Sequence, residues 1–237
     1  MLIYIITMPR VDRSKVRRRR RRKASFLSKN ARKQVTAIAK KVAMSLPEKK
    51  VFGFQEENIQ LYHNKTLYLG KWLNCSQGTG DPNDMADRLV RIGDEIYLRN
   101  VNIRLWLSNK LDRPNVMYKA YLFWYEAGTT LDDATCYFTN TNKMLDRPNN
   151  EKITVIDKKT IFSGPSYENG TEKHEHSYLC TLNANWKNHK ITYDEGGSQP
   201  KKRDIGMMLV CYDAFGTLQT DNIASFAYNG TITLQDP

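Results

Sequence analysis

From about residue 51 onward, short apolar runs rich in β-branched and aromatic residues alternate with turns rich in Gly, Pro, Asn and Asp. This alternation is typical of an all-β domain. The chain shows no internal repeat, and no apolar run approaches the ~20 residues that a membrane-spanning helix needs, so no membrane insertion is expected. The predicted strands cover residues 51–61, 66–73, 95–108, 116–126, 153–162, 174–182, 186–193, 205–215 and 223–234.

Three of these strands have informative side-chain patterns. Residues 116–126 and 205–215 are apolar on both faces, which predicts central strands with one face on the core and the other covered by a neighbour. In residues 95–108 the apolar positions are even up to Leu98 and odd from Val101 onward. A β-bulge near Arg99 would turn both sets towards the core.

About eight main strands with long connections predict one antiparallel jelly roll, in which two four-stranded sheets pack face to face. The longest connection, residues 127–151, has room for a short helix around residues 131–140. A sandwich of the immunoglobulin type is the structural alternative, but the Cys…Trp…Cys spacing of that fold is absent. The fold class is therefore predicted as all-β, a single eight-stranded jelly roll with a basic N-terminal arm.

The segment before the strands changes character at Ser28. Apolar residues recur at helical spacing through Leu46, Ser28 is a plausible N-cap, and Pro47 follows. Residues 28–46 are thus predicted either as a short amphipathic helix that forms against nucleic acid or a neighbouring subunit, or as part of an unfolded arm. Residues 8–27 are dense in charge and have little to bury, so disorder is predicted there.

Charge divides the chain at the same place. Through Lys50 there are 17 Lys and Arg against 2 Asp and Glu, a net of +15, whereas the remainder has 20 against 23, a net of −3. We therefore predict two parts: residues 1–50, a basic and largely disordered arm, and residues 51–237, a jelly-roll domain. The basic excess lies in the arm, so the arm is expected to bind a polyanion while the domain does something else.

The arm contains seven consecutive cations, residues 17–23. Such a run stays solvated until a polyanion neutralises it, and arginine suits phosphate because its fork bonds two oxygens at once. The same tract is a candidate nuclear localisation signal, formed by Arg17, Arg18, Arg19, Arg20, Arg21, Arg22 and Lys23. The predicted nucleic-acid-binding residues are these seven with Arg10, Arg13, Lys15, Lys29, Arg32, Lys33, Lys40 and Lys41.

The first seven residues are apolar but too short for a signal-peptide core, and the arginines follow rather than precede them. Met8 is a second possible start of translation, and the two starts stay open. The four cysteines, Cys75, Cys136, Cys180 and Cys211, are widely spaced without a CxxC pair. A zinc site is therefore not expected, and free buried thiols are predicted.

No pattern of catalytic residues emerges. His174 and His176 would share one face of a strand as a metal pair, but a third ligand is not evident, and a polar loop edge is the alternative. The Gly78-x-Gly80 spacing is explained by turn chemistry, because the strand–loop–helix context of a phosphate loop is missing. Arg91 and Asp94 are predicted to pair locally or across a subunit interface, with a plain surface pair as the alternative. No catalytic residue, cofactor or metal site is predicted.

Five aromatic residues are candidates for stacking on nucleic-acid bases, with packing in the core or in an interface as the alternative for each. They are Tyr62, Trp72, Trp106, Tyr118 and Trp186.

Two motifs resemble a known family. The loop Gln-Gly-Thr-Gly-Asp at residues 77–81 is followed by Arg-Ile-Gly-Asp-Glu-Ile at residues 91–96, which leads into a long strand. Together with the Met-Pro-Arg start of the arm and the Val-Ile-Asp-Lys-Lys-Thr-Ile-Phe strand at residues 155–162, these resemble the capsid proteins of small circular Rep-encoding single-stranded DNA (CRESS DNA) viruses. The spacer at residues 82–90 is longer than in the commonest versions.

The resemblance implies a structural protein of the virion: a single jelly roll that assembles into a closed icosahedral shell of about sixty copies. It also implies packaging of a circular single-stranded DNA genome by the arm, entry into the host nucleus through import receptors, and attachment to a cell-surface receptor. Two alternatives remain, the capsid protein of a small RNA virus, and a cellular nucleic-acid-binding protein with a β-sandwich partner module. Composition cannot separate DNA from RNA because both present phosphate.

Overall fold

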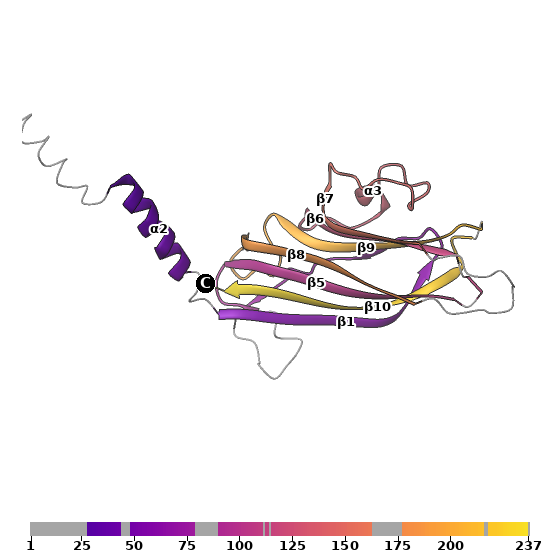
Figure 1. Ribbon diagram of the computed structural model, residues 1–237, viewed down its shortest axis with the longest axis horizontal. Coiled ribbons are helices and arrows are strands. Elements are labelled where there is room, and N and C mark those ends of the chain that lie inside the picture. Colours follow the sequence, from indigo (N-terminus) through magenta and orange to yellow (C-terminus); the bar gives the residue numbers. More distant parts are fainter. Residues whose placement is uncertain are drawn as a thin grey trace, which may run out of the picture. The chain divides into compact units, whose positions relative to one another are not determined.

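The computed structural model describes residues 28–43, 48–78, 90–110, 112–113, 115–162, 177–215 and 218–236, in two units, Met1–Pro47 and Glu48–Pro237 (Figure 1). The predicted disorder of residues 8–27, the arginine run at residues 17–23 and the His174–His176 pair all lie outside the described residues. No helix in the described part is long and apolar enough to cross a bilayer.

The first unit contains one described element, the helix α2 (Lys29–Ala43). Ser28 begins it as an N-cap: the backbone N–H of Ala31 donates to the Ser28 hydroxyl at 3.1 Å, and the N–H of Arg32 donates to the Ser28 carbonyl at 2.9 Å. Of the two alternatives for residues 28–46, the structure has the helix, over the shorter range Lys29–Ala43.

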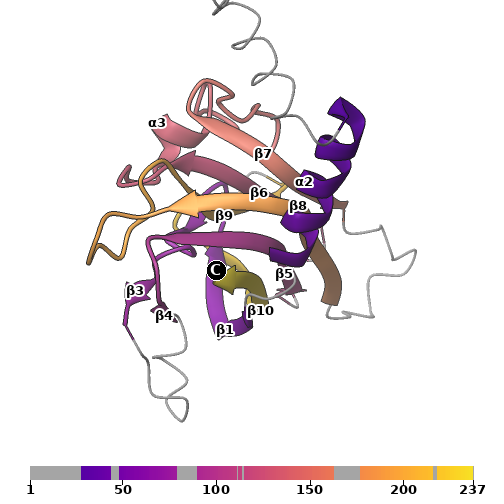
Figure 2. The same ribbon diagram turned by 90° about the vertical axis from the view of Figure 1, so that its left-hand side faces the viewer.

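The second unit is a jelly roll of eight antiparallel strands in two four-stranded sheets (Figures 1 and 2). The first sheet has the order β1-β10-β5-β8, and the second has the order β2-β9-β6-β7. The strands of the first sheet are β1 (Glu48–Tyr62), β10 (Asn222–Asp236), β5 (Glu95–Asn109) and β8 (Ser177–Thr192). Those of the second are β2 (Leu67–Leu69), β9 (Arg203–Asp213), β6 (Val116–Glu126) and β7 (Ile153–Phe162).

The pairing is nested. Strand β1 pairs with β10, β2 with β9, β5 with β8, and β6 with β7, each antiparallel. The chain therefore folds as a long hairpin that is rolled into two layers, which defines the jelly roll. A parallel pair of two-residue strands, β3 (Ser76–Gln77) and β4 (Val90–Arg91), lies outside the two sheets.

The main core fills the space between the sheets. Strand β5 contributes Ile96, Leu98, Val101, Ile103, Leu105 and Leu107, all fully buried. The pairing of β5 with both neighbours shifts register between Leu98 and Asn100, so Arg99 forms the predicted bulge. Because of this bulge, the even and odd apolar positions of the strand face the same core.

The second core lies on the other face of the β6 and β9 sheet. There Tyr121, Phe123, Tyr125 and Met208 pack against Tyr137. The cover belongs to the connection between β6 and β7, which holds the short helix α3 (Asp133–Cys136) and lies over this sheet in Figure 1. The predicted covering of a doubly apolar strand is confirmed, with a segment of the same chain as the cover. The predicted short helix is confirmed as well, and Asp132 caps it by accepting from the Thr135 N–H at 2.7 Å.

Two strand predictions were wrong. The predicted pair 174–182 and 186–193 is one strand, β8, because Asn183 and Asn185 continue the ladder instead of forming a turn. The predicted strand 66–73 shrinks to β2, Leu67–Leu69. A Cβ at Gly70 would lie 2.8 Å from a methyl carbon of Leu131, and the next residue, Lys71, has a φ of 62° that ends the extended backbone.

Candidate nucleic-acid interface

The structure places part of the predicted nucleic-acid-binding set. Lys29, Arg32, Lys33 and Lys41 are exposed on α2, and Lys40 belongs to the same helix. Arg10, Arg13, Lys15 and residues 17–23 lie outside the described part of the chain.

Helix α2 separates charge from apolar surface. Lys29 and Lys33 are one turn apart, so they share a face. The apolar residues Val35, Ile38 and Val42, at spacings of three and four, form a stripe on a different face, and each is more than half exposed among the described residues. The first turn carries no acidic residue. A helix of this kind is suited to a polyanion on one side and an apolar contact on the other.

The motif residues Arg91 and Asp94 pair locally, at 3.1 Å between Arg91 Nη1 and Asp94 Oδ1. The Arg91 side chain is fully buried and donates to the carbonyls of Gly93, Asp194 (2.9 Å) and Gly197 (2.6 Å). Its guanidinium carbon also lies 4.5 Å from the ring centroid of Tyr193. Arg91 therefore fastens β4 to the β8–β9 turn. The predicted local pair is present within the chain.

A second buried contact completes this corner. Asp236, at the end of β10, accepts from Lys50 Nζ at 2.9 Å and from the Ile92 N–H at 2.8 Å. The carboxylate thus joins β1, the motif and the last strand. The sequence did not single out Asp236, and only its place at the end of an alternating strand could have indicated burial.

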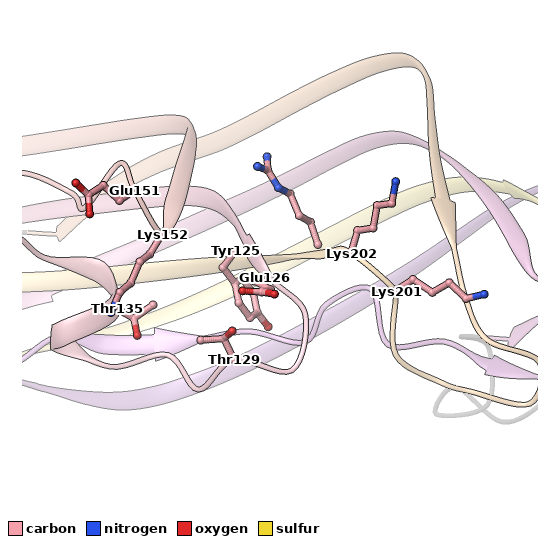
Figure 3. A pocket seen from close by; sticks show the side chains of 9 residues that line it. Tyr125, Glu126, Thr129, Thr135, Glu151, Lys152, Lys201 and Lys202 are labelled. Atoms are coloured by element: carbon pink, nitrogen blue, oxygen red, sulfur yellow. The ribbon is translucent and has the colours of Figure 1, made fainter.

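An open pocket of about 600 Å³ lies beside the same turn, where the end of β6 meets the start of β9 (Figure 3). Four cations and two carboxylates line it. Lys201 is paired with Asp194 at 2.9 Å, and burial raises the pKa of the Tyr125 phenol to about 12. The charge suits an anion, and neither histidine nor cysteine lines the pocket. Its lining residues are Tyr125, Glu126, Thr129, Thr135, Glu151, Lys152, Lys201, Lys202 and Arg203.

The described histidines serve the fold. His63 Nδ1 accepts the backbone N–H of Asp213 at 3.1 Å, and burial lowers the pKa of this imidazole. The His189 ring lies 4.9 Å from that of Trp124, and burial lowers its pKa as well. No cluster of metal-ligating side chains occurs in the described part of the chain. The four cysteines are free, and Cys75, Cys136 and Cys211 are buried.

The outer face of the β1-β10-β5-β8 sheet has an unusual composition. Five rows of residues in register cross it and point away from the core. Arg104 is the one charged side chain in these rows, and amide and hydroxyl side chains dominate. The rows are Val51, Thr233, Asn100 and Asn185; Gly53, Thr231, Asn102 and Asn183; Gln55, Asn229, Arg104 and Thr181; Ala227, Trp106 and Leu179; and Gln60, Ser225, Ser108 and Ser177.

The amides of this face bond to one another across strands. Asn100 Nδ2 donates to the side-chain oxygens of Asn183 at 3.0 Å and Asn185 at 2.7 Å. This polar face was not among the predicted sites. The signal was present as alternate Asn and Thr positions in 100–104, 181–185 and 229–233, which alternation assigns to solvent.

Comparison with known proteins gives structural matches only. No family model and no curated protein matches the sequence. The fold is similar to a solved structure titled "Desmodium yellow mottle tymovirus", with 10% identity and a TM-score of 0.32 over 81% of this chain and 89% of that one. An empty head of turnip yellow mosaic virus gives 10% identity and a TM-score of 0.27 over 81% and 82%.

A T13 viral particle of IBDV gives 8% identity and a TM-score of 0.27 over 80% of this chain and 32% of that one. The jelly-roll assignment rests on the nested strand order of this chain rather than on these matches.

Proposed function

We propose that this chain is the capsid protein of a small CRESS DNA virus, which assembles into an icosahedral shell and packages circular single-stranded DNA through its N-terminal arm. The observation that carries the proposal is the combination of a jelly roll with a strongly basic N-terminal segment, whose net charge through Lys50 is +15. A jelly roll by itself serves many functions, so the arm decides what the fold is used for.

The second unit has the properties that a shell subunit needs. Its charge from residue 51 onward is −3, so many copies touch without strong mutual repulsion. Several large apolar side chains are exposed at its loops and strand ends, where they are available to neighbouring subunits. They include Ile92, Phe138, Leu145, Phe162, Phe215 and Leu218.

The arm has the properties that packaging needs. About sixty copies would bring on the order of 900 positive charges into one cavity. Arginine-rich segments neutralise phosphate without reading bases, so the arm binds a genome of any sequence. DNA is proposed over RNA on the resemblance of the 77–81 loop and the 91–96 motif to CRESS virus capsids.

The arginine run at residues 17–23 serves, in this proposal, as a nuclear localisation signal that host import receptors bind before assembly. A reporter fused to residues 8–50 should accumulate in nuclei, and replacement of the seven cations by Gln should abolish this. Nuclear accumulation that survives the replacement would remove the import role while leaving packaging untouched.

Electron microscopy of the purified full-length protein tests the central proposal. Closed particles of uniform diameter are expected, and their nucleic acid should be circular and degraded by DNase but not by RNase. Cargo degraded only by RNase would assign the chain to an RNA virus. Soluble monomers or small oligomers under all assembly conditions would overturn the capsid function and favour a cellular nucleic-acid-binding protein.

A further inference from the structure

Trp106 differs from the other tryptophans of the jelly roll. Trp72 and Trp124 are buried, and Trp186 is half-buried with its ring 5.5 Å from that of Trp124. Trp106 lies on the outer face of β5 and is 57% exposed. Of the five aromatic residues that were candidates for base stacking, Tyr118 and Trp72 are buried and Tyr62 is half-buried, so the structure leaves Trp106 as the one with an open ring.

The neighbours of Trp106 form a short apolar strip. In register it pairs with Ala227 on β10 and with Leu179 on β8, and the Leu179 side chain is 76% exposed. The rows on either side of this strip are polar: one contains Ser225, Ser108 and Ser177, and the other contains Arg104. An exposed indole between two aliphatic side chains, with hydrogen-bonding rows beside it, offers a flat π-surface at which water is easily displaced.

The charge of this face favours one kind of occupant. The described residues of the five rows include no carboxylate, and exposed Arg104 lies one row from Trp106. Further along the same face, Arg99 donates to Gln235 Oε1 at 2.7 Å through Nε. The nearest described carboxylates lie at the edges of these rows: exposed Glu57 in the bulge of β1, and Asp157, which accepts from the Asn183 N–H at 2.9 Å. The rows themselves combine a cation, amides and an aromatic ring, which is complementary to single-stranded nucleic acid, whose bases stack on aromatic rings and whose phosphates bind Arg.

We propose that the outer face of the β1-β10-β5-β8 sheet is a second nucleic-acid contact, in which an unpaired base stacks on Trp106 and a phosphate binds Arg104. The neighbouring amide rows offer donors and acceptors to base edges. This inference rests on the proposed packaging function and adds to it that the folded domain, as well as the arm, touches the cargo. Unlike the arm, this contact distinguishes bases from a bare phosphate chain.

Dissociated full-length subunits test the inference with two probes, a single-stranded oligonucleotide and an abasic phosphate chain of the same length. At high salt, where contacts of the arm weaken, the wild type should bind the oligonucleotide about fivefold or more tightly than the abasic chain, since one stacked base accounts for at least this factor. Trp106→Ala should abolish this preference without weakening the abasic complex. Trp106→Phe should restore part of the preference.

Two controls keep the outcomes separate. Phe138→Ala removes a ring that is exposed to the same extent, 58%, on the connection after α3, and should leave the preference unchanged. Replacement of residues 17–23 by Gln should weaken binding to both probes alike, which tests the packaging function of the arm and not the stacking contact.

Equal affinity of the wild type for the two probes would overturn the inference, even if the arm variant behaves as expected. A Trp106→Ala protein that keeps the base preference but no longer assembles would also overturn it, because the strip would then be a contact between subunits. Tryptophan fluorescence gives an independent readout. Binding of the oligonucleotide should quench the fluorescence of the wild type but not that of Trp106→Phe, because the other three indole rings are buried or half-buried.

Discussion

Arg91 is a fully buried cation whose contacts only a guanidinium can make together. It reaches three backbone carbonyls, the Asp94 carboxylate and the face of Tyr193 at once. A lysine carries one nitrogen in place of this planar fork. We expect Arg91→Lys to lower the free energy of unfolding by about 2–4 kcal/mol, because carbonyls that lose their donor stay buried. Chemical denaturation of dissociated subunits measures this difference.

The matched control for this substitution is Arg104→Lys. This variant carries the same chemical change at an exposed position of β5, so its free energy of unfolding should stay within about 0.5 kcal/mol of the wild type. Equal stabilities of the Arg91→Lys and Arg104→Lys proteins would contradict the fastening role of Arg91.

Asp204 is the opposite case, a buried carboxyl group of which only one oxygen accepts hydrogen bonds. Its Oδ1 accepts from the N–H groups of Leu73 and Ile205, whereas its Oδ2 is buried without a hydrogen-bond partner among the described residues. Burial raises its pKa to about 6 from 3.8. The folded state therefore favours the protonated carboxyl. The stability that this group contributes is fully present below pH 3.8 and is lost as pH rises through about 6.

We expect Asp204→Asn to remove this pH dependence. The stability of the variant relative to the wild type should improve by about 2 kcal/mol between pH 4 and pH 7, which is most of the cost of ionising the wild-type carboxyl. The lowered pKa values of His63 and His189 act in the reverse direction, because neutral imidazoles stabilise the fold at high pH and this contribution is lost as pH falls. Both proteins keep these histidines, so their effect cancels in the difference. A pH-independent difference would show that the carboxyl is already ionised at low pH.

At the scale of elements, the features that depend on residues adjacent in sequence could be predicted. The bulge at Arg99 followed from a parity change within one strand, and the N-cap at Ser28 from the residues next to it. The shortness of β2 could not be predicted, because it depends on Gly70 meeting Tyr125 and Leu131, which are distant in sequence. The continuity of β8 was missed because Asn183 and Asn185 have turn propensity, which cross-strand pairing with β5 overrides.

The sequence predicted the cationic residues of the candidate site but not the exposed aromatic ring. Clustered charge identified the cationic residues of the arm and α2 directly. The predicted bulge turns the odd positions from Val101 onward to the core, which places Trp106 on the opposite face of β5. Parity alone does not show whether that opposite face is covered, as it is for β6, or exposed.

Helix α2 should respond to its polyanion. The helix has 15 residues, is marginal in isolation, and begins with cations that oppose its macrodipole. In a peptide of residues 24–47, addition of single-stranded DNA at low salt should raise the helical circular dichroism signal, because phosphates remove the unfavourable charge. Ser28→Ala should lower the helicity, since loss of an N-cap costs about 1 kcal/mol. Ser45→Ala, which makes the same chemical change at a residue outside Lys29–Ala43, is the control. No gain of helicity with DNA would contradict a role of α2 in binding it.

At the scale of the whole molecule, the nested pairing ties the two ends of the jelly roll together. Strand β1 pairs with β10 over nearly its full length, and β2 pairs with β9, so the first and last segments of the domain complete each other. Such long-range pairing makes folding slow and dependent on the complete domain. The described residues before β1, by contrast, form the helix α2 and contribute no strand to either sheet, whereas residues 48–50 of the predicted arm belong to β1. Changes to the charge of the arm before β1 should therefore alter the cargo and leave the fold intact.

The amount of cargo should follow the charge of the arm. Replacing residues 17–23 by Gln lowers the net charge through Lys50 from +15 to +8. In a shell of about sixty copies, the positive charge then falls from on the order of 900 to about half. If phosphates are held mainly by neutralisation, the packaged nucleic acid should shorten by a similar factor, while the melting temperature of the dissociated subunit stays unchanged. The ratio of absorbance at the nucleic-acid and protein maxima of purified particles, with the length of the extracted strand, measures this.

The salt dependence of binding should change as well. For the full-length subunit, the slope of log K against log salt should become shallower by roughly 0.7 for each phosphate contact removed. Unchanged cargo length with a reduced salt slope would mean that the shell volume, rather than the arm, limits how much is packaged.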